Sequence, residues 1–263
     1  MMFDEGIFRE CLKQYKDNFK QRFSDERYKW EAVQWFQTHW DINAENFYQM
    51  FTDATEKTFN LLASMNNFPR GMIQVYSEQD PEAVRAMFIN LFDESKDVAE
   101  RVVQFQADAQ ELCDRLSPGK QHFQRPMAIS VYLWLHNPDK YCIFKYTALR
   151  KATVYLKNDF IPKKGNPIQN IRGNIEFTEE IQKIIKKDEE LITAFQSARD
   201  DSCYADSNLL TLANDIEIYI SSEIVDNDDN GHWMAEDYNS GISKNRWKEL
   251  IADEKILDRK SVV

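Results

Sequence analysis

The spacing of apolar residues in the first half of the chain most constrains the fold, because it repeats with the period of an α-helix. Over 47–61 the apolar side chains follow i, i+3, i+4 and i+7 spacing, and Asn43 before them can cap a helix. Asp80 followed by Pro81 is a second helix start, with a capping carboxylate and a proline suited to the first turn. The sequence therefore predicts a mainly α-helical protein.

Further helices are expected from the same periodicity and from cap and stop residues. They cover residues 25–40, 95–116, 126–136 and 147–158, and later segments that start at Thr178, Ser207 and Ser243. Only seven of the 263 residues are glycine, which disfavours an all-β protein with many tight turns. The same scarcity leaves no glycine-rich loop to hold phosphates, so the chain is not expected to hydrolyse a nucleotide.

One small β element is expected near residues 139–146. Aromatic and β-branched residues occupy both alternations of this segment, which is typical of a short strand covered on both faces. The expected organisation is a helical N-terminal domain over 1–160, a linker or long loop over 161–174, and a second helical segment over 175–263. The last segment either stands apart or packs on the first as one domain.

The stretch NPDKYCIFKY, residues 137–146, contains the start of a metal-dependent nuclease pattern, in which Pro-Asp is followed by a lysine. That chemistry needs a second carboxylate two residues before the lysine, so that two acids hold Mg²⁺. Ile143 stands two residues before Lys145 and binds no metal. We therefore expect no complete nuclease site, no catalytic residue and no cofactor, and hence a protein that is not an enzyme.

A formal calcium-loop pattern, DNDDNG, occupies residues 226–231. Its candidate ligands are Asp226, Asp228, Asn230 and Asp237. Asp237 stands where the usual ligand is a bidentate glutamate, and its side chain is too short to reach the ion in the same way. A solvated polar loop is therefore the favoured interpretation, and a calcium site is the weaker one.

The net charge of −11 argues against nucleic-acid binding, but the charges are unevenly distributed. Residues 118–164 contain nine Lys or Arg and two Asp, whereas residues 200–243 contain eleven Asp or Glu and no Lys or Arg. Eight aromatic residues lie among the cations, and such mixtures can hold phosphates and stack on bases. The candidate DNA contacts, with Arg70 added from an earlier loop, are Lys120, Arg125, Arg150, Lys151, Lys157, Lys163, Lys164 and Arg70.

An alternative interpretation makes the aromatic residues core and the cations the solvated face of the same helices. Within the helix expected after Thr147, Arg150 and Lys157 are seven residues apart and should align as one basic stripe. The acidic segment 200–243 offers a different function, contact with a basic partner.

Four stretches of the chain are together similar to a known family. They are KWEAVQWFQTHWDINA at 29–44, LLASMNNFPRGMI at 61–73, EAVRAMFINLFDESKDVAERVVQFQADAQEL at 82–112 and AISVYLWLHNPDKYCIFKY at 128–146. These resemble the N-terminal region of McrB-type AAA+ restriction NTPases, which are specific for 5-methylcytosine. GISKNRWKEL at 241–250 resembles the segment that leads toward the rest of longer members.

The resemblance implies a DNA-recognition or targeting module of a modification-dependent restriction system that defends against phage. In that family an NTPase domain hydrolyses nucleotide and a separate nuclease subunit cuts DNA. This chain ends before any Walker motif, so we expect the recognition region alone, with DNA, the NTPase domain and the nuclease subunit as partners. The alternative is a protein-interaction or structural module that positions the NTPase ring or binds a basic partner. A stand-alone nuclease-like enzyme is the weaker alternative.

The expected compartment follows from the N-terminus and the cysteines. MMFDEGIFRECLKQ lacks the basic start and apolar run of a signal peptide, and no stretch approaches the ~18 apolar residues of a membrane span. Cys11, Cys113, Cys142 and Cys203 are scattered, without metal-ligand spacing. We expect a cytoplasmic protein with free thiols and no membrane partner.

Overall fold

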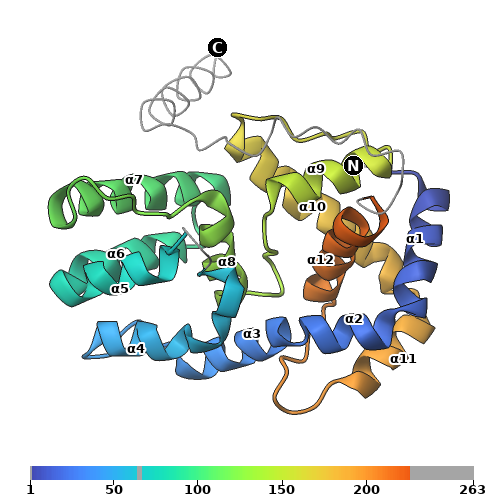
Figure 1. Cartoon of the computed structure of the whole chain (residues 1–263), viewed down its shortest axis with the longest axis horizontal. Coiled ribbons are helices and arrows are strands. Elements are labelled where there is room, and N and C mark those ends of the chain that lie inside the picture. The colour runs from blue at the N-terminus through green and yellow to red at the C-terminus, as the bar shows by residue number, and fades with distance from the viewer. Residues whose placement is uncertain (1, 64–66, 226–263) are drawn as a thin grey trace.

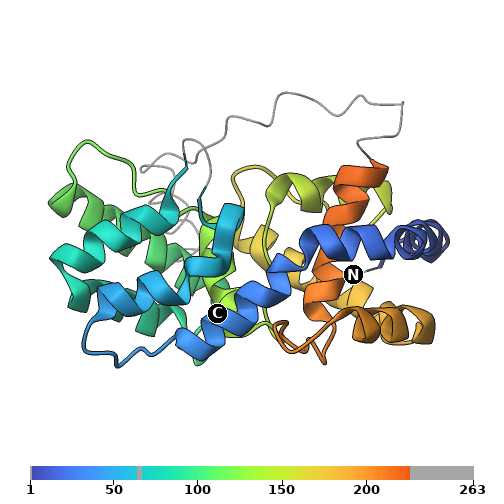
Figure 2. The ribbon, with the colours of Figure 1, turned by 60° about the horizontal axis from the view of Figure 1, so that its bottom comes forward.

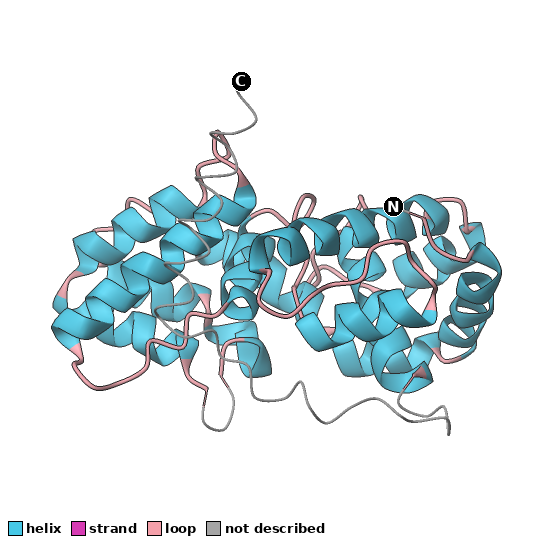
Figure 3. Cartoon of the chain, turned by 90° about the horizontal axis from the view of Figure 1, so that it is seen from above, coloured by secondary structure: helices cyan, strands magenta, loops and turns pink. Residues whose placement is uncertain are grey.

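The computed structural model describes residues 2–63 and 67–225, which form an elongated assembly of helices (Figure 1). The helices are α1 (Glu5–Asp17), α2 (Phe19–Glu26), α3 (Tyr28–His39), α4 (Phe47–Ala54), α5 (Pro69–Gln79), α6 (Pro81–Leu91), α7 (Val98–Leu116), α8 (Pro126–His136), α9 (Tyr146–Tyr155), α10 (Pro167–Ile185), α11 (Glu189–Ala198) and α12 (Leu210–Tyr219), with short helical turns η1 (Glu56–Leu61) and η2 (Ile220–Ile224). The mainly α fold is confirmed, and Figure 3 shows no strand in the described part of the chain. No helix there has the length and apolar content needed to cross a membrane.

The strongest predicted helix start is confirmed. Pro81 is the first residue of α6, and the Asp80 carboxylate accepts a hydrogen bond from the Ala83 N–H. Other predicted caps were displaced by two or three residues. Asp97 rather than Ser95 caps α7, and Asn46 rather than Asn43 caps α4. In each case the residue that caps is the one whose side-chain oxygen reaches the free N–H groups of the first turn.

The helices fall into two groups joined by a central pair. Helices α4 to α7 lie at one end of the molecule, and α1, α2 and α9 to α12 lie at the other (Figures 1 and 2). Helices α3 and α8 pack on each other between these groups, and α10 packs against both α7 and α12. One cluster of buried apolar side chains extends from Phe8 to Val225 through both groups. Residues 175–225 therefore pack on the first part of the chain through a shared core.

The β element expected at 139–146 is wrong, because residues 141–145 have no regular secondary structure and pair with no strand. Side chains replace the missing strand. Ile143 exchanges two hydrogen bonds with the side-chain amide of Asn214 in α12, and the Phe144 N–H donates to Ser130 Oγ in α8. Buried backbone groups need partners, and two neighbouring helices supply them here. The apolar alternation predicted burial of the segment correctly but not the type of partner.

The loop expected over 161–174 is also shorter than predicted, because Pro167 begins α10. The remaining loop, 161–166, is held by the buried side chain of Asn170. This amide accepts from the Lys163 N–H (3.0 Å) and donates to the Lys163 carbonyl (2.8 Å). Gly165 has a φ of +82°, a left-handed conformation that suits glycine. The segment is thus an anchored turn into a helix.

Helix α9 ends at Tyr155, three residues before the predicted end, and this removes the predicted basic stripe. Lys157 lies beyond the helix with a φ of +53°. Arg150 and Lys157 consequently do not share a helical face, and any basic surface here depends on the turn that follows α9.

Candidate functional site

Five of the predicted cations gather where α9, the turn after it and the loop 161–166 meet. We call this region the loop edge. Lys157, Lys163 and Lys164 are exposed, and Arg150 and Lys151 are half-buried. Arg150 Nη1 donates to the Pro162 carbonyl at 3.2 Å, which ties α9 to the loop. The loop edge therefore combines a fixed backbone with exposed lysine side chains.

The surroundings of the loop edge are only partly acidic. Lys157 Nζ lies 3.8 Å from Asp4 Oδ2, a long ion pair in which the lysine remains 71% exposed. Helix α10 starts at Pro167 beside Lys163 and Lys164, and its first turn contains no acidic residue. The N-terminus of a helix carries partial positive charge, and this adds to that of the two lysines. The arrangement suits an anion such as a backbone phosphate.

Three other predicted cations lie near a second place, where the segment 120–125 meets the start of α5. We call this region the aromatic junction, formed by residues 67–70 and 120–125. Lys120 and Arg125 are exposed. Arg70 instead turns toward α4, where Nε donates to Thr55 Oγ1 and Nη2 donates to the Thr52 carbonyl, both at 2.9 Å. The Arg70 guanidinium thus holds α5 on α4.

Gln124 joins the two parts of the aromatic junction. It is fully buried, and its Nε2 donates to the Pro69 carbonyl at 2.7 Å. The Tyr132 hydroxyl donates to Gln124 Oε1 at 3.2 Å, and Gln106 Nε2 donates to the Gln124 carbonyl at 2.9 Å. Because every one of these bonds is buried, the position of segment 120–125 relative to α5 is fixed.

Phe68 is the feature of the aromatic junction that the sequence analysis missed. It is 50% exposed, which is unusual for a large aromatic side chain. Its ring lies 6.1 Å from that of Phe123 at an interplanar angle of 88°. The sequence feature that could have identified Phe68 is the stretch NNFPRG, in which an aromatic residue in a polar segment directly precedes the helix-starting Pro69.

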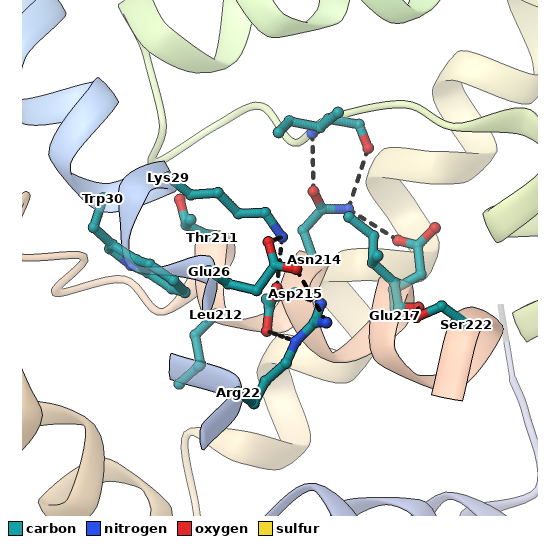
Figure 4. A network of polar contacts seen from close by, with 12 residues as sticks. Arg22, Glu26, Lys29, Trp30, Thr211, Leu212, Asn214, Asp215, Glu217 and Ser222 are labelled. Atoms are coloured by element: carbon teal, nitrogen blue, oxygen red, sulfur yellow. Dashed lines mark hydrogen bonds and ion pairs between the residues drawn. The ribbon is translucent and has the colours of Figure 1, made fainter. Parts of the chain in front are cut away.

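Three of the six acids that the structure describes in the acidic segment, Asp206, Asp215 and Glu217, are buried. Asp215 lies in α12, and all residues of that helix are buried. Its carboxylate accepts from Arg22 Nε (3.0 Å) and Nη2 (2.9 Å) and from Lys29 Nζ (2.6 Å) (Figure 4). It also accepts from the Tyr15 hydroxyl (2.9 Å). Glu26 also pairs with Arg22 and Lys29, at 3.1 and 2.8 Å. We call Arg22, Glu26, Lys29 and Asp215 the buried charge network.

The buried charge network sets the protonation of Asp215. Burial alone would raise the pKa of this carboxyl group, but Lys29 and Arg22 outweigh burial and lower the pKa from 3.8 to about 2. The network holds two cations and two carboxylates, so its formal charge is balanced. It is an interior tie between α2, α3 and α12 rather than a surface for a partner.

Two further acids of the segment are buried without a cation at hydrogen-bonding distance. Burial raises the pKa of Glu217 to about 7, although Thr178 Oγ1 and Asn214 Nδ2 donate to its Oε2 at 2.9 and 3.1 Å. Burial likewise raises the pKa of Asp206 to about 7, against donors that include Trp30 Nε1 at 3.1 Å. Both groups therefore favour the protonated form more than ordinary carboxyl groups do.

The internal use of these acids bears on the alternative of a basic partner. Asp200, at the start of the segment, pairs with Arg27 at 2.5 Å. Asp215, Asp206 and Glu217 are buried. Asp200 and Asp215 thus pair with cations of the same chain, and Asp206 and Glu217 are buried, which reduces the support for an acidic docking surface.

Residues 2–63 and 67–225 contain no group of three or more His, Cys, Asp or Glu that could hold a metal ion. Asp226, Asp228, Asn230 and Asp237 of the calcium pattern lie outside the described residues. The four cysteines are buried free thiols, and burial raises the pKa of Cys142 well above its usual range. Comparison with protein-family models, curated proteins and solved structures found no match in any of the three.

Proposed function

We propose that the chain is a non-catalytic DNA-recognition module of a McrB-type, modification-dependent restriction system. The observation that carries the proposal is the loop edge, where Lys157, Lys163 and Lys164 are exposed together in a protein of net charge −11. Surface cations concentrated in one place attract a polyanion locally even when the whole molecule is acidic. The resemblance of residues 29–146 to the N-terminal region of that family supports the same function.

In this proposal the loop edge contacts the phosphate backbone. The lysine side chains provide charge, while Asn170 holds the loop backbone and Arg150 ties the loop to α9. A contact of this kind fixes the position of DNA but carries no sequence information. Recognition of a base or of its modification therefore requires a second contact.

The proposed partners follow from the module's place in such a system. DNA is the ligand, an NTPase domain provides energy and a nuclease subunit cuts, all in the cytoplasm. The competing function, a module that binds a basic partner through the acidic segment, has less support. Asp206, Asp215 and Glu217 are buried inside the fold and are not available to a partner.

The test is the salt dependence of binding by the whole chain. Labelled duplexes with and without 5-methylcytosine are titrated from about 50 to 200 mM salt, and anisotropy is recorded. Three lysines are exposed at the loop edge, and each can contact one phosphate. At about −0.9 per phosphate, the slope of log K against log salt should be about −2.7. No binding of any duplex at about 50 mM salt would exclude the function.

A further inference from the structure

We propose that the aromatic junction binds an unpaired base of single-stranded nucleic acid, with Phe68 and Phe123 contacting the base and with Lys120 and Arg125 contacting the adjoining phosphates. This inference rests on the proposed function, because it assumes a nucleic-acid ligand. It goes beyond that function by naming a second surface and the strand state that the surface selects.

The first support is the exposure of an aromatic pair. Phe68 is 50% exposed, and Phe123, at a ring distance of 6.1 Å, is half-buried beside it. Exposing a large aromatic ring to water is unfavourable, because burial of apolar area is the main favourable term in folding. Two rings at 88° present a face and an edge at right angles, and a flat aromatic ligand can contact both.

The second support is that the protein fixes the backbone at Phe123. Phe123 has a φ of +56°, a left-handed conformation that is rare for an aromatic residue and persists only where the surroundings enforce it. The neighbouring Gln124 enforces it through its buried bonds to Pro69 and Tyr132. A surface already held in its binding conformation loses little entropy when a ligand docks.

The third support is the charge around the rings. Lys120 and Arg125 are exposed, and residues 117–125 contain no acid. Helices α5 and α8 begin at the junction, with Pro69 and Pro126, and neither has an acidic residue in its first turn. Asp114 acts on His122, but burial and Arg125 outweigh it and lower the His122 pKa to about 4. The charged residues of the junction itself are therefore basic.

These features together fit an unpaired base better than a duplex. Single-strand binding surfaces combine cations that follow the backbone with aromatic faces on which bases stack. In a duplex the base faces are already stacked on one another and are not available to a protein side chain. At the loop edge the aromatic residues Tyr155 and Phe160 are half-buried and neither is exposed as Phe68 is, so the lysines are its main contacts for a ligand.

The test compares single-stranded and duplex DNA of the same sequence, each labelled, by anisotropy at about 50 mM salt. The variants are Phe68→Ala, Phe68→Leu, Phe68→Trp and the charge control Lys163→Ala with Lys164→Ala. Thermal melts establish that each variant folds. We expect Phe68→Ala and Phe68→Leu to weaken single-strand binding by about 5- to 150-fold, the range of one lost stacking contact. Phe68→Trp should retain binding, and duplex binding should not change in any of the three.

The outcomes separate the two proposals. If Phe68→Ala and Phe68→Leu bind single strands as the wild type does, the aromatic junction is not a base-binding surface, whatever happens with duplex. If both variants lose the same affinity for single strands and for duplex, the selectivity for unpaired bases is overturned. If single strands bind through Phe68 but duplexes do not bind at all, the inference stands and the loop-edge function fails. Absence of binding to either form overturns both.

Discussion

Asn214 and Ile143 form two reciprocal hydrogen bonds across the interior of the protein. The Ile143 N–H donates to Asn214 Oδ1 at 3.1 Å, and Asn214 Nδ2 donates to the Ile143 carbonyl at 3.2 Å. This is the pair of bonds that a neighbouring strand would provide, made by one side chain on α12. Segment 141–145 is thereby fixed against a helix whose residues are all buried.

Replacement of Asn214 should therefore destabilise the folded protein. Asn214→Ala leaves two buried backbone groups of Ile143 without partners and also removes a donor to Glu217. We expect the free energy of unfolding to fall by about 3 kcal/mol, as measured by urea denaturation. Asn166→Ala is the matched control, because Asn166 is bonded only to exposed Gln169 Oε1 through its side chain, and it should cost less than about 0.5 kcal/mol. Equal losses in the two variants would contradict this account of segment 141–145.

The buried charge network gives a prediction with a defined pH window. Asp215→Asn leaves Arg22 and Lys29 with Glu26 alone, and should lower the free energy of unfolding at neutral pH by about 3–5 kcal/mol. The folded-state pKa of Asp215 is depressed from 3.8 to about 2, so its stabilisation is present above pH 3.8 and is lost as pH falls toward 2. Urea denaturation across this range should show that the free energy of unfolding of the wild type declines as pH falls. The Asp215→Asn variant should lack this decline. Asp25→Asn, at an exposed carboxylate on α2, is the control and should follow the wild type.

The stabilisation provided by Glu217 should depend on pH in the opposite direction, falling as pH rises. Its pKa is raised from 4.5 to about 7, so the contribution of the protonated group is full below pH 4.5 and is lost as pH rises to 7. Glu217→Gln cannot ionise, and its amide oxygen can still accept from Thr178 and Asn214. Between about pH 5 and 8 the wild type should lose on the order of 3 kcal/mol relative to this variant. Parallel pH profiles for the two proteins would show that Glu217 is not held protonated.

The helices of the first half could be predicted because their signals are local. Asp80 and Pro81 determine the start of α6 by a cap and a fixed backbone angle, and neither depends on distant residues. Segment 141–145 has an equally clear pattern, but Asn214, its partner, lies about 70 residues away in sequence, and no local rule identifies it. The end of α9 was missed for a similar reason, since only the folded structure shows the left-handed residue after it.

The candidate sites likewise contain some features that the sequence shows directly and others that depend on tertiary contacts. Charge counting found Lys163 and Lys164 because a sequence shows where lysines are, and most lysines are exposed. It also counted Asp215 as surface charge, whereas the fold buries this residue against Arg22 and Lys29 from a segment almost 200 residues earlier. The aromatic junction depends on Gln124 reaching Pro69, and such tertiary contacts leave no periodic signal.

The backbone at Lys157 gives a prediction for stability alone. Its φ of +53° lies in the left-handed region, where any side chain with a Cβ is strained. Lys157→Gly should therefore be more stable than Lys157→Ala by about 0.5–1 kcal/mol, although glycine is the more flexible residue in the unfolded chain. Thermal or urea denaturation of the two variants measures the difference. A more stable alanine variant would mean that residue 157 is not left-handed in solution.

The most direct test of DNA recognition through the loop edge is the salt slope of the double variant Lys163→Ala, Lys164→Ala beside a matched control. Lys13→Ala with Lys20→Ala removes the same charge from exposed positions on α1 and α2. The account predicts that the loop-edge variant folds normally, binds duplex more weakly and has a slope of log K against log salt smaller in magnitude by about 1.8, while the control keeps the wild-type slope. Equal slopes for the two variants, or a loss shared by both, would contradict a specific phosphate contact at Lys163 and Lys164.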